Sequence, residues 1–127
     1  MNQIFISYAH KDTDFVELLR IKLKEADIVA WVDHNSLKAG TDWQKSIDEG
    51  IKNSMAVVLV MSPDSLNSHF VTYEWSYANG LGKAIIPLMY REAVLYGKLI
   101  TLQYLDFTHR TLRPWDELIQ LIKTRNI

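Results

Sequence analysis

The chain has 127 residues, of which 48% are hydrophobic and 23% charged, a composition that supports one domain with its own core and excludes a disordered or fibrous protein. Lysine and arginine number 14 against 15 aspartates and glutamates, which leaves no positive excess for a nucleic-acid partner. The lack of cysteine excludes disulfides and thiolate nucleophiles. No apolar run approaches the ~20 residues of a membrane helix. We therefore expect a single cytoplasmic domain over residues 1–127 with no membrane partner.

The first half of the chain predicts two strands, each followed by a helix. Residues 4–8 and residues 28–32 are apolar at successive positions, which is typical of strands covered on both faces. Residues 15–26 carry apolar side chains at three- and four-residue steps and predict the first helix. Residues 43–51 are apolar at every fourth position and predict the second helix.

The middle of the chain repeats this alternation. Residues 56–61 and residues 84–90 are apolar runs that again predict strands buried on both faces. Residues 68–79 between them predict a third helix, which Gly80 ends because glycine is favoured just beyond a helix terminus.

The last part of the chain gives weaker signals. Residues 91–100 are compatible with a short helix or a loop, and residues 101–107 predict a fifth strand with less apolar character than the others. A final helix is predicted over residues 114–122, because Pro114 suits a first helical turn and apolar residues recur after it.

Alternating strands and helices over the whole length predict an α/β fold in which a five-stranded parallel sheet has helices on both faces. For a sheet of this size the commonest strand order is the flavodoxin-like 2-1-3-4-5. Ligands of such sheets bind beyond the carboxyl ends of the strands where the order reverses, here between strands one and three. Residues 7–12 and residues 62–68 are the loops expected to flank that position.

One carboxylate in the third predicted helix lies among apolar side chains. Glu74 is the only charged residue between Asp64 and Lys83. On a helical wheel it shares a face with Phe70, Val71, Trp75, Tyr77, Ala78 and Leu81. Burial of an unpaired carboxylate is costly, so its position indicates a site. An ion pair with Lys83 or Arg91, or contact with water at the edge of the helix, would account for it as well.

Four motifs occur in a fixed order and together span nearly the whole chain. They are Phe5-Ile6-Ser7-Tyr8 with Asp12, Asp33-x-x-x-Leu37-x-x-Gly40-x-x-Trp43-x-x-x-Ile47, Val57-Val58-Leu59 with Ser62, and Ser68-x-Phe70-x-x-x-Glu74. Each motif is weak by itself. In this order and at these spacings the sequence resembles a Toll/interleukin receptor (TIR) domain of the bacterial and plant type.

The resemblance implies the fold already predicted and, as in many members of the family, cleavage of NAD+ between nicotinamide and ribose, with Glu74 as the essential carboxylate. In NAD+ the nicotinamide is a cationic pyridinium, and it departs from the ribose as a neutral molecule. Its departure therefore requires no proton from a general acid. A single carboxylate can then stabilise the oxocarbenium-like ribose. NAD+ would be the substrate, the product ADP-ribose or a cyclic ADP-ribose isomer, and no cofactor is expected.

Four further residues are candidates for binding NAD+. Ser7 and Tyr8 end the first predicted strand and would orient the ribose or the phosphates. Trp43 or Phe70 would stack on the pyridinium through a cation–π interaction. Each also has a structural alternative, because Ser7 can cap a turn and Trp43 can anchor the second helix in the core. Phe70 stands where the family commonly has tryptophan.

The loop after the second strand resembles the one through which TIR domains pack together. His34, Leu37, Lys38 and Gly40 are the predicted self-association residues, and Ala39 replaces the proline that often precedes this glycine in the family. The resemblance implies activity that depends on self-association, in bacterial defence or as an effector. The alternative is a non-catalytic interaction module that signals by TIR–TIR assembly.

Other chemistries have little support in the sequence. The histidines, His10, His34, His69 and His109, show no paired spacing and no acidic cluster, so we expect no metal site. A Ser7-His10-Asp12 triad lacks the Gly-x-Ser-x-Gly turn that presents a nucleophilic serine. No glycine-rich phosphate loop is present, so a dinucleotide must be held differently from that of a Rossmann enzyme.

Overall fold

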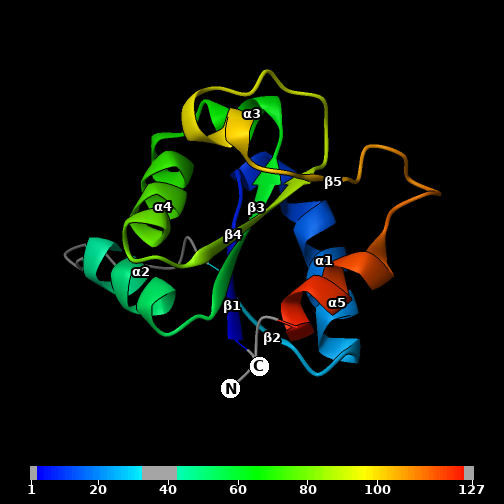
Figure 1. The fold of residues 1–127 in the computed structure, drawn as a ribbon, viewed down its shortest axis with the longest axis horizontal. Helices are drawn as coiled ribbons and strands as arrows, with labels where there is room; N and C mark the ends of the chain where they lie inside the picture. Colours follow the sequence, from blue (N-terminus) through cyan, green and yellow to red (C-terminus); the bar gives the residue numbers. More distant parts are fainter. Residues whose placement is uncertain (1–2, 33–42, 125–127) are drawn as a thin grey trace.

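The computed structural model describes residues 3–32 and 43–124, which form a five-stranded parallel sheet between two layers of helices (Figure 1). The strands are β1 (Gln3–Ser7), β2 (Val29–Val32), β3 (Ala56–Met61), β4 (Ala84–Met89) and β5 (Leu105–Asp106). Their order is β2-β1-β3-β4-β5 with every neighbouring pair parallel, which confirms the predicted topology.

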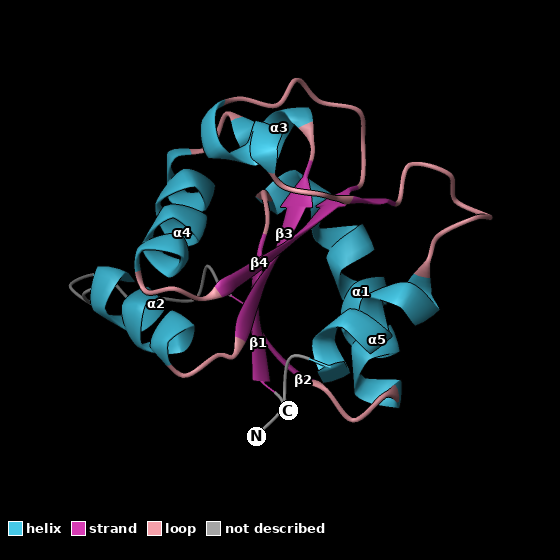
Figure 2. Ribbon diagram, in the orientation of Figure 1, coloured by secondary structure: helices cyan, strands magenta, loops and turns pink. Residues whose placement is uncertain are grey.

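Helices cover both faces of the sheet (Figure 2). They are α1 (Thr13–Glu25), α2 (Trp43–Lys52), α3 (Pro63–Leu66), α4 (His69–Gly80) and α5 (Trp115–Thr124), with short 3-10 helices η1 (His10–Asp12) and η2 (Gly97–Thr101). α2 and α4 lie on one side of the sheet, and α1 and α5 lie on the other (Figure 1). α3 follows β3 at the carboxyl end of the sheet, where the predicted site lies.

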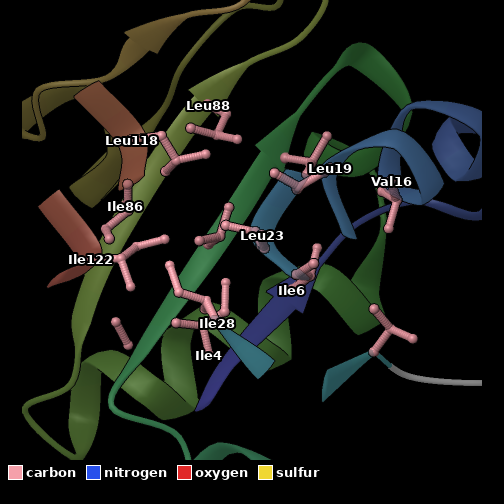
Figure 3. Close-up of a cluster of buried hydrophobic side chains, with 14 of the residues drawn as sticks. Ile4, Ile6, Val16, Leu19, Leu23, Ile28, Ile86, Leu88, Leu118 and Ile122 are labelled. Atoms are coloured by element: carbon pink, nitrogen blue, oxygen red, sulfur yellow. The ribbon is translucent and has the colours of Figure 1, made fainter. Parts of the chain in front are cut away.

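The larger core cluster fills the space between the sheet and the α1/α5 layer (Figure 3). α1 contributes Leu19 and Leu23, and α5 contributes Leu118 and Ile122, all fully buried. Such burial is the main favourable contribution to folding, about 1.5–3 kcal/mol for each large aliphatic side chain. This face of the molecule is therefore a packed support for the sheet.

Side chains along β1 alternate between the two faces, as the two-residue period of a strand requires. Ile4 and Ile6 belong to the cluster on the α1/α5 side, whereas Phe5 belongs to the cluster that includes residues of α2 and α4. Ser7 lies on the same side as Phe5, and its hydroxyl contacts α4. β1 therefore ends in a buried polar group that faces α4.

Two strands differ from their predictions because they lie at the edges of the sheet. β2 was expected to be buried on both faces, but Val29 is 58% exposed. The fifth strand was expected over residues 101–107, yet only Leu105 and Asp106 pair with β4, after η2 has ended. Short edge strands expose few unpaired backbone groups, which limits edge-to-edge aggregation.

α3 is a four-residue helix that hydrophobic periodicity could not reveal. Its signal is at its start, where Ser62 and Ser65 form a reciprocal capping box and Pro63 occupies the first turn. This turn directs the chain away from the carboxyl end of β3 and into α4.

Gly50 allows α2 to approach the sheet closely. A Cβ atom at this position would lie 3.0 Å from the ring of Trp31, which itself stacks on Phe5. We expect Gly50→Ala to lower the free energy of unfolding by about 1–2 kcal/mol through overpacking, although alanine favours a helix. Gly80→Ala is the control, because its Cβ would meet nothing within 4 Å. Urea unfolding midpoints compare the two, and equal midpoints would contradict the expectation.

Candidate active site

Glu74 lies on the buried stripe of α4. The fully or nearly buried residues of this helix are Val71, Glu74, Trp75 and Ala78. Their three- and four-residue spacing places them along one face. Glu74 is only 3% exposed, so the carboxylate is inside the protein, as the wheel predicts. Phe70 and Leu81 are predicted on the same face but are exposed. Both lie at the border of the stripe, where exposure depends on the neighbouring element.

The Ser7 hydroxyl donates a hydrogen bond to Oε1 of Glu74 at 2.6 Å. Ser7 is fully buried, so the two polar groups meet inside the protein. Ala78, one helical turn after Glu74, packs in the same cluster as Phe5, two residues before Ser7. The four residues from Glu74 to Ala78 along the helix and the two residues from Ser7 to Phe5 along the strand each span about 6 Å. The two pairs therefore face each other, with α4 and β1 running in opposite directions.

This pair lies where the strand order reverses. β1 pairs with β2 on one side and with β3 on the other, and Ser7 is in register with Leu59 of β3. The sequence predicted a site at the carboxyl ends of strands one and three, and the structure brings Ser7 and Glu74 together there.

A second buried carboxylate is held at the same edge. Asp12 of η1 accepts a hydrogen bond from the Ser62 hydroxyl at 2.5 Å and lies 3.0 Å from Nη2 of Arg91. Arg91 also contacts Asp64 of α3 at 2.7 Å. The hydrogen bond to Asp64, aided by Asp12, raises the pKa of Arg91 above its ordinary value. These contacts join η1, α3 and the segment after β4 into one network.

This network was not recognised from the sequence, because its members come from three distant segments. The sequence places Asp12 in a motif and in a possible serine triad, and it offers Arg91 as a partner for Glu74. The structure pairs Arg91 with Asp12 and Asp64, and Lys83 donates to the backbone carbonyl of Lys52. Lys83 and Arg91, the two cations that the sequence offers as partners of Glu74, therefore have other partners in the structure.

Trp43 and Phe70 meet edge to face, with ring centroids 4.9 Å apart. Trp43 begins α2 and is 39% exposed, so it lies outside the buried core. Phe70 in the first turn of α4 is 54% exposed. Tyr73 packs beside Trp43 and donates a hydrogen bond to Asp48 at 2.6 Å, which raises the pKa of Tyr73. The result is an exposed aromatic surface that begins one helical turn before Glu74.

The remaining candidates are Tyr8 and the predicted self-association residues. Tyr8 packs against the core cluster on the α1/α5 side of the sheet, opposite to α4. The predicted self-association residues, His34, Leu37, Lys38 and Gly40, lie outside the described residues.

Within residues 3–32 and 43–124 no group of three or more histidines, aspartates and glutamates is arranged to hold a metal ion. In the same ranges no helix has the length and apolar character needed to cross a membrane.

Residues 4–122 match a family model described as the TIR domain. The chain is 39% identical over 75 residues to the NAD(+) hydrolase PdTIR of Paracoccus denitrificans, covering 58% of this chain and 23% of that protein. It is 35% identical over 72 residues to the 2' cyclic ADP-D-ribose synthase AbTIR of Acinetobacter baumannii, covering 56% of this chain and 27% of that protein. Each match therefore spans only about a quarter of the relative's length (23% and 27%).

A solved structure gives a likeness over nearly the full length. The crystal structure of the TIR domain of the Toll-related receptor TRR-2 from Hydra magnipapillata has a TM-score of 0.83 and 29% sequence identity. The likeness covers 94% of this chain and 97% of that chain.

Proposed function

The chain belongs to the TIR domain family, and from that premise we propose that it cleaves NAD+ between nicotinamide and ribose, with Glu74 as the catalytic carboxylate. The observation that carries the proposal is the buried Glu74 at the carboxyl end of β1, held there by the hydroxyl of Ser7. Two relatives that bear the names of an NAD+ hydrolase and a cyclic ADP-ribose synthase support the choice of substrate.

The chemistry requires one negative charge near the ribose. As the bond between C1′ and the pyridinium nitrogen breaks, its electron pair stays with nicotinamide, which leaves neutral. The ribose becomes an oxocarbenium ion, which a fixed carboxylate stabilises more strongly than it stabilises the bound substrate. Burial of Glu74 strengthens this attraction, because few water molecules screen the charge.

The exposed rings of Trp43 and Phe70 supply a surface for the cationic nicotinamide. Either ring can attract a pyridinium through its face, and Phe70 lies one helical turn before Glu74. Capture of the ribose cation by water gives ADP-ribose, and capture by a hydroxyl or adenine nitrogen of the same molecule gives a cyclic isomer. The names of the two relatives correspond to these two outcomes.

We further propose that self-association increases the activity, with the segment around Gly40 contributing to the contact. In a purified preparation incubated with NAD+, we expect nicotinamide release per molecule to rise as the protein concentration is raised. Chromatography of the products distinguishes ADP-ribose from a cyclic isomer. The same rate per molecule at every concentration would contradict the role of self-association. No nicotinamide at any concentration would instead favour an interaction module that turns over no substrate.

A further inference from the structure

We infer that Ser7 is a positioning residue for Glu74, fixing Oε1 of the carboxylate and favouring its ionised form, and that it does not bind the substrate. The kinetic part of this inference rests on the proposed NAD+ cleavage, whereas the contact between Ser7 and Glu74 does not. The role differs from the one predicted from the sequence, where Ser7 was expected to orient the ribose or the phosphates.

Burial is the first argument. Ser7 is 0% exposed, whereas Glu74 keeps 3% of its surface exposed, so of the two groups the carboxylate lies nearer to a bound ribose. A buried hydroxyl needs a hydrogen-bond partner inside the protein, and Ser7 has that partner in Glu74. The structure thus assigns the donor of Ser7 to the carboxylate.

The geometry of the hydrogen bond is the second argument. Its 2.6 Å separation between Oγ of Ser7 and Oε1 of Glu74 is that of a direct O–H···O hydrogen bond. Ser7 donates to Oε1, and donation to the charged form stabilises the carboxylate relative to the carboxylic acid. The hydroxyl of Ser7 therefore offsets part of the cost of burying the charge of Glu74.

The rigidity of β1 is the third argument. β1 pairs with β2 and with β3, and Ser7 itself is in register with Leu59. A glutamate side chain has several rotatable bonds, whereas the last residue of an internal strand has little freedom. The hydroxyl of Ser7 thus connects a flexible carboxylate to a fixed point in the sheet, which keeps the charge where the ribose cation would form.

Ser7→Ala is the direct test, with Ser54→Ala as its matched control. Ser54 is equally buried but lies before β3, at the opposite end of the sheet, where its hydroxyl donates to the carbonyl of Gly50. We expect Ser7→Ala to lower kcat for nicotinamide release by about 10- to 100-fold, the factor that corresponds to one hydrogen bond to a charged group. KM should change by less than about twofold, and Ser54→Ala should alter neither constant by more than that.

Ser7→Thr and Ser7→Val keep the test decisive if a small residue at this position perturbs the fold. The two side chains have nearly the same shape, but only threonine retains the hydroxyl. We expect Ser7→Thr to turn over NAD+ at least about 10-fold faster than Ser7→Val. Equal rates for the two variants would overturn the inference, and so would a raised KM with unchanged kcat, which indicates direct contact with the substrate.

A titration separates this inference from the proposed function. The isotope-labelled carboxyl carbon of Glu74 is followed by NMR against pH, with Glu74→Gln identifying its signal. We expect the midpoint to move to higher pH in Ser7→Ala, because the hydrogen bond that favours the charged form is lost. An unmoved midpoint would overturn the positioning role even in an active enzyme. A moved midpoint in a protein that releases no nicotinamide would leave the contact established and refute the proposed NAD+ cleavage.

Discussion

Glu74→Gln is expected to lower the rate of nicotinamide release by at least about 1,000-fold, because it removes the charge that stabilises the ribose cation. The glutamine side chain keeps the shape of glutamate, and its amide oxygen can still accept the hydrogen bond from Ser7. We therefore expect the variant to fold and to unfold at a urea concentration no lower than the parent. Rates of nicotinamide release at saturating NAD+ measure the effect.

Glu49→Gln is the control for the loss of one negative charge. Glu49 lies on α2 and its side chain is exposed, so the variant should turn over NAD+ at the rate of the parent. If Glu74→Gln kept more than about a tenth of the parental rate, the loss would be too small for a catalytic carboxylate. That result would contradict the assignment of Glu74.

Asp12→Ala is expected to lower the free energy of unfolding by about 2–3 kcal/mol, because it removes a buried carboxylate that accepts a hydrogen bond from Ser62 and contacts the half-exposed Arg91. The side chain of Asp12 is 1% exposed, and its removal leaves the Ser62 hydroxyl and one side of Arg91 without the carboxylate that they contact. Since this network joins η1 to α3 at the carboxyl edge of the sheet, the loss is also expected to reduce NAD+ cleavage. Urea unfolding followed by circular dichroism measures the stability.

Asp64→Ala provides the matched comparison. Asp64 contacts the same guanidinium at 2.7 Å, but its side chain is 35% exposed. Pairs that water reaches contribute little, so this variant should lose less than about 1 kcal/mol. If the two variants lost the same stability, the burial of Asp12 would not be the reason for its importance.

The positions of the strands and of Glu74 could be predicted because their signals are local. An apolar run such as residues 56–61 indicates a buried strand, and β3 has these bounds with every residue buried. The three- and four-residue spacing around Glu74 placed the carboxylate on the inner face of its helix, where the structure has it. Both patterns are complete within one element, so no tertiary information was needed.

Edge effects could not be predicted in the same way. Val29 was assigned to a strand buried on both faces, yet it is exposed because β2 has a neighbour only in β1 among the described strands. Phe70 was assigned to the apolar face of its helix and is exposed beside Trp43. Exposure at such positions depends on which element happens to lie next to them, which a periodic pattern does not contain.

The sequence by itself therefore determined the α/β class and a single carboxylate on a buried helical face, whereas the order of the strands was predicted only as the commonest one for such a sheet. Only the tertiary structure decided the partner of that carboxylate, because Ser7 and Glu74 are 67 positions apart. It also decided that Arg91 binds Asp12 and Asp64. The physical reason is that periodicity fixes which face of an element is buried, whereas the contacts across that face follow from the register in which separate elements pack.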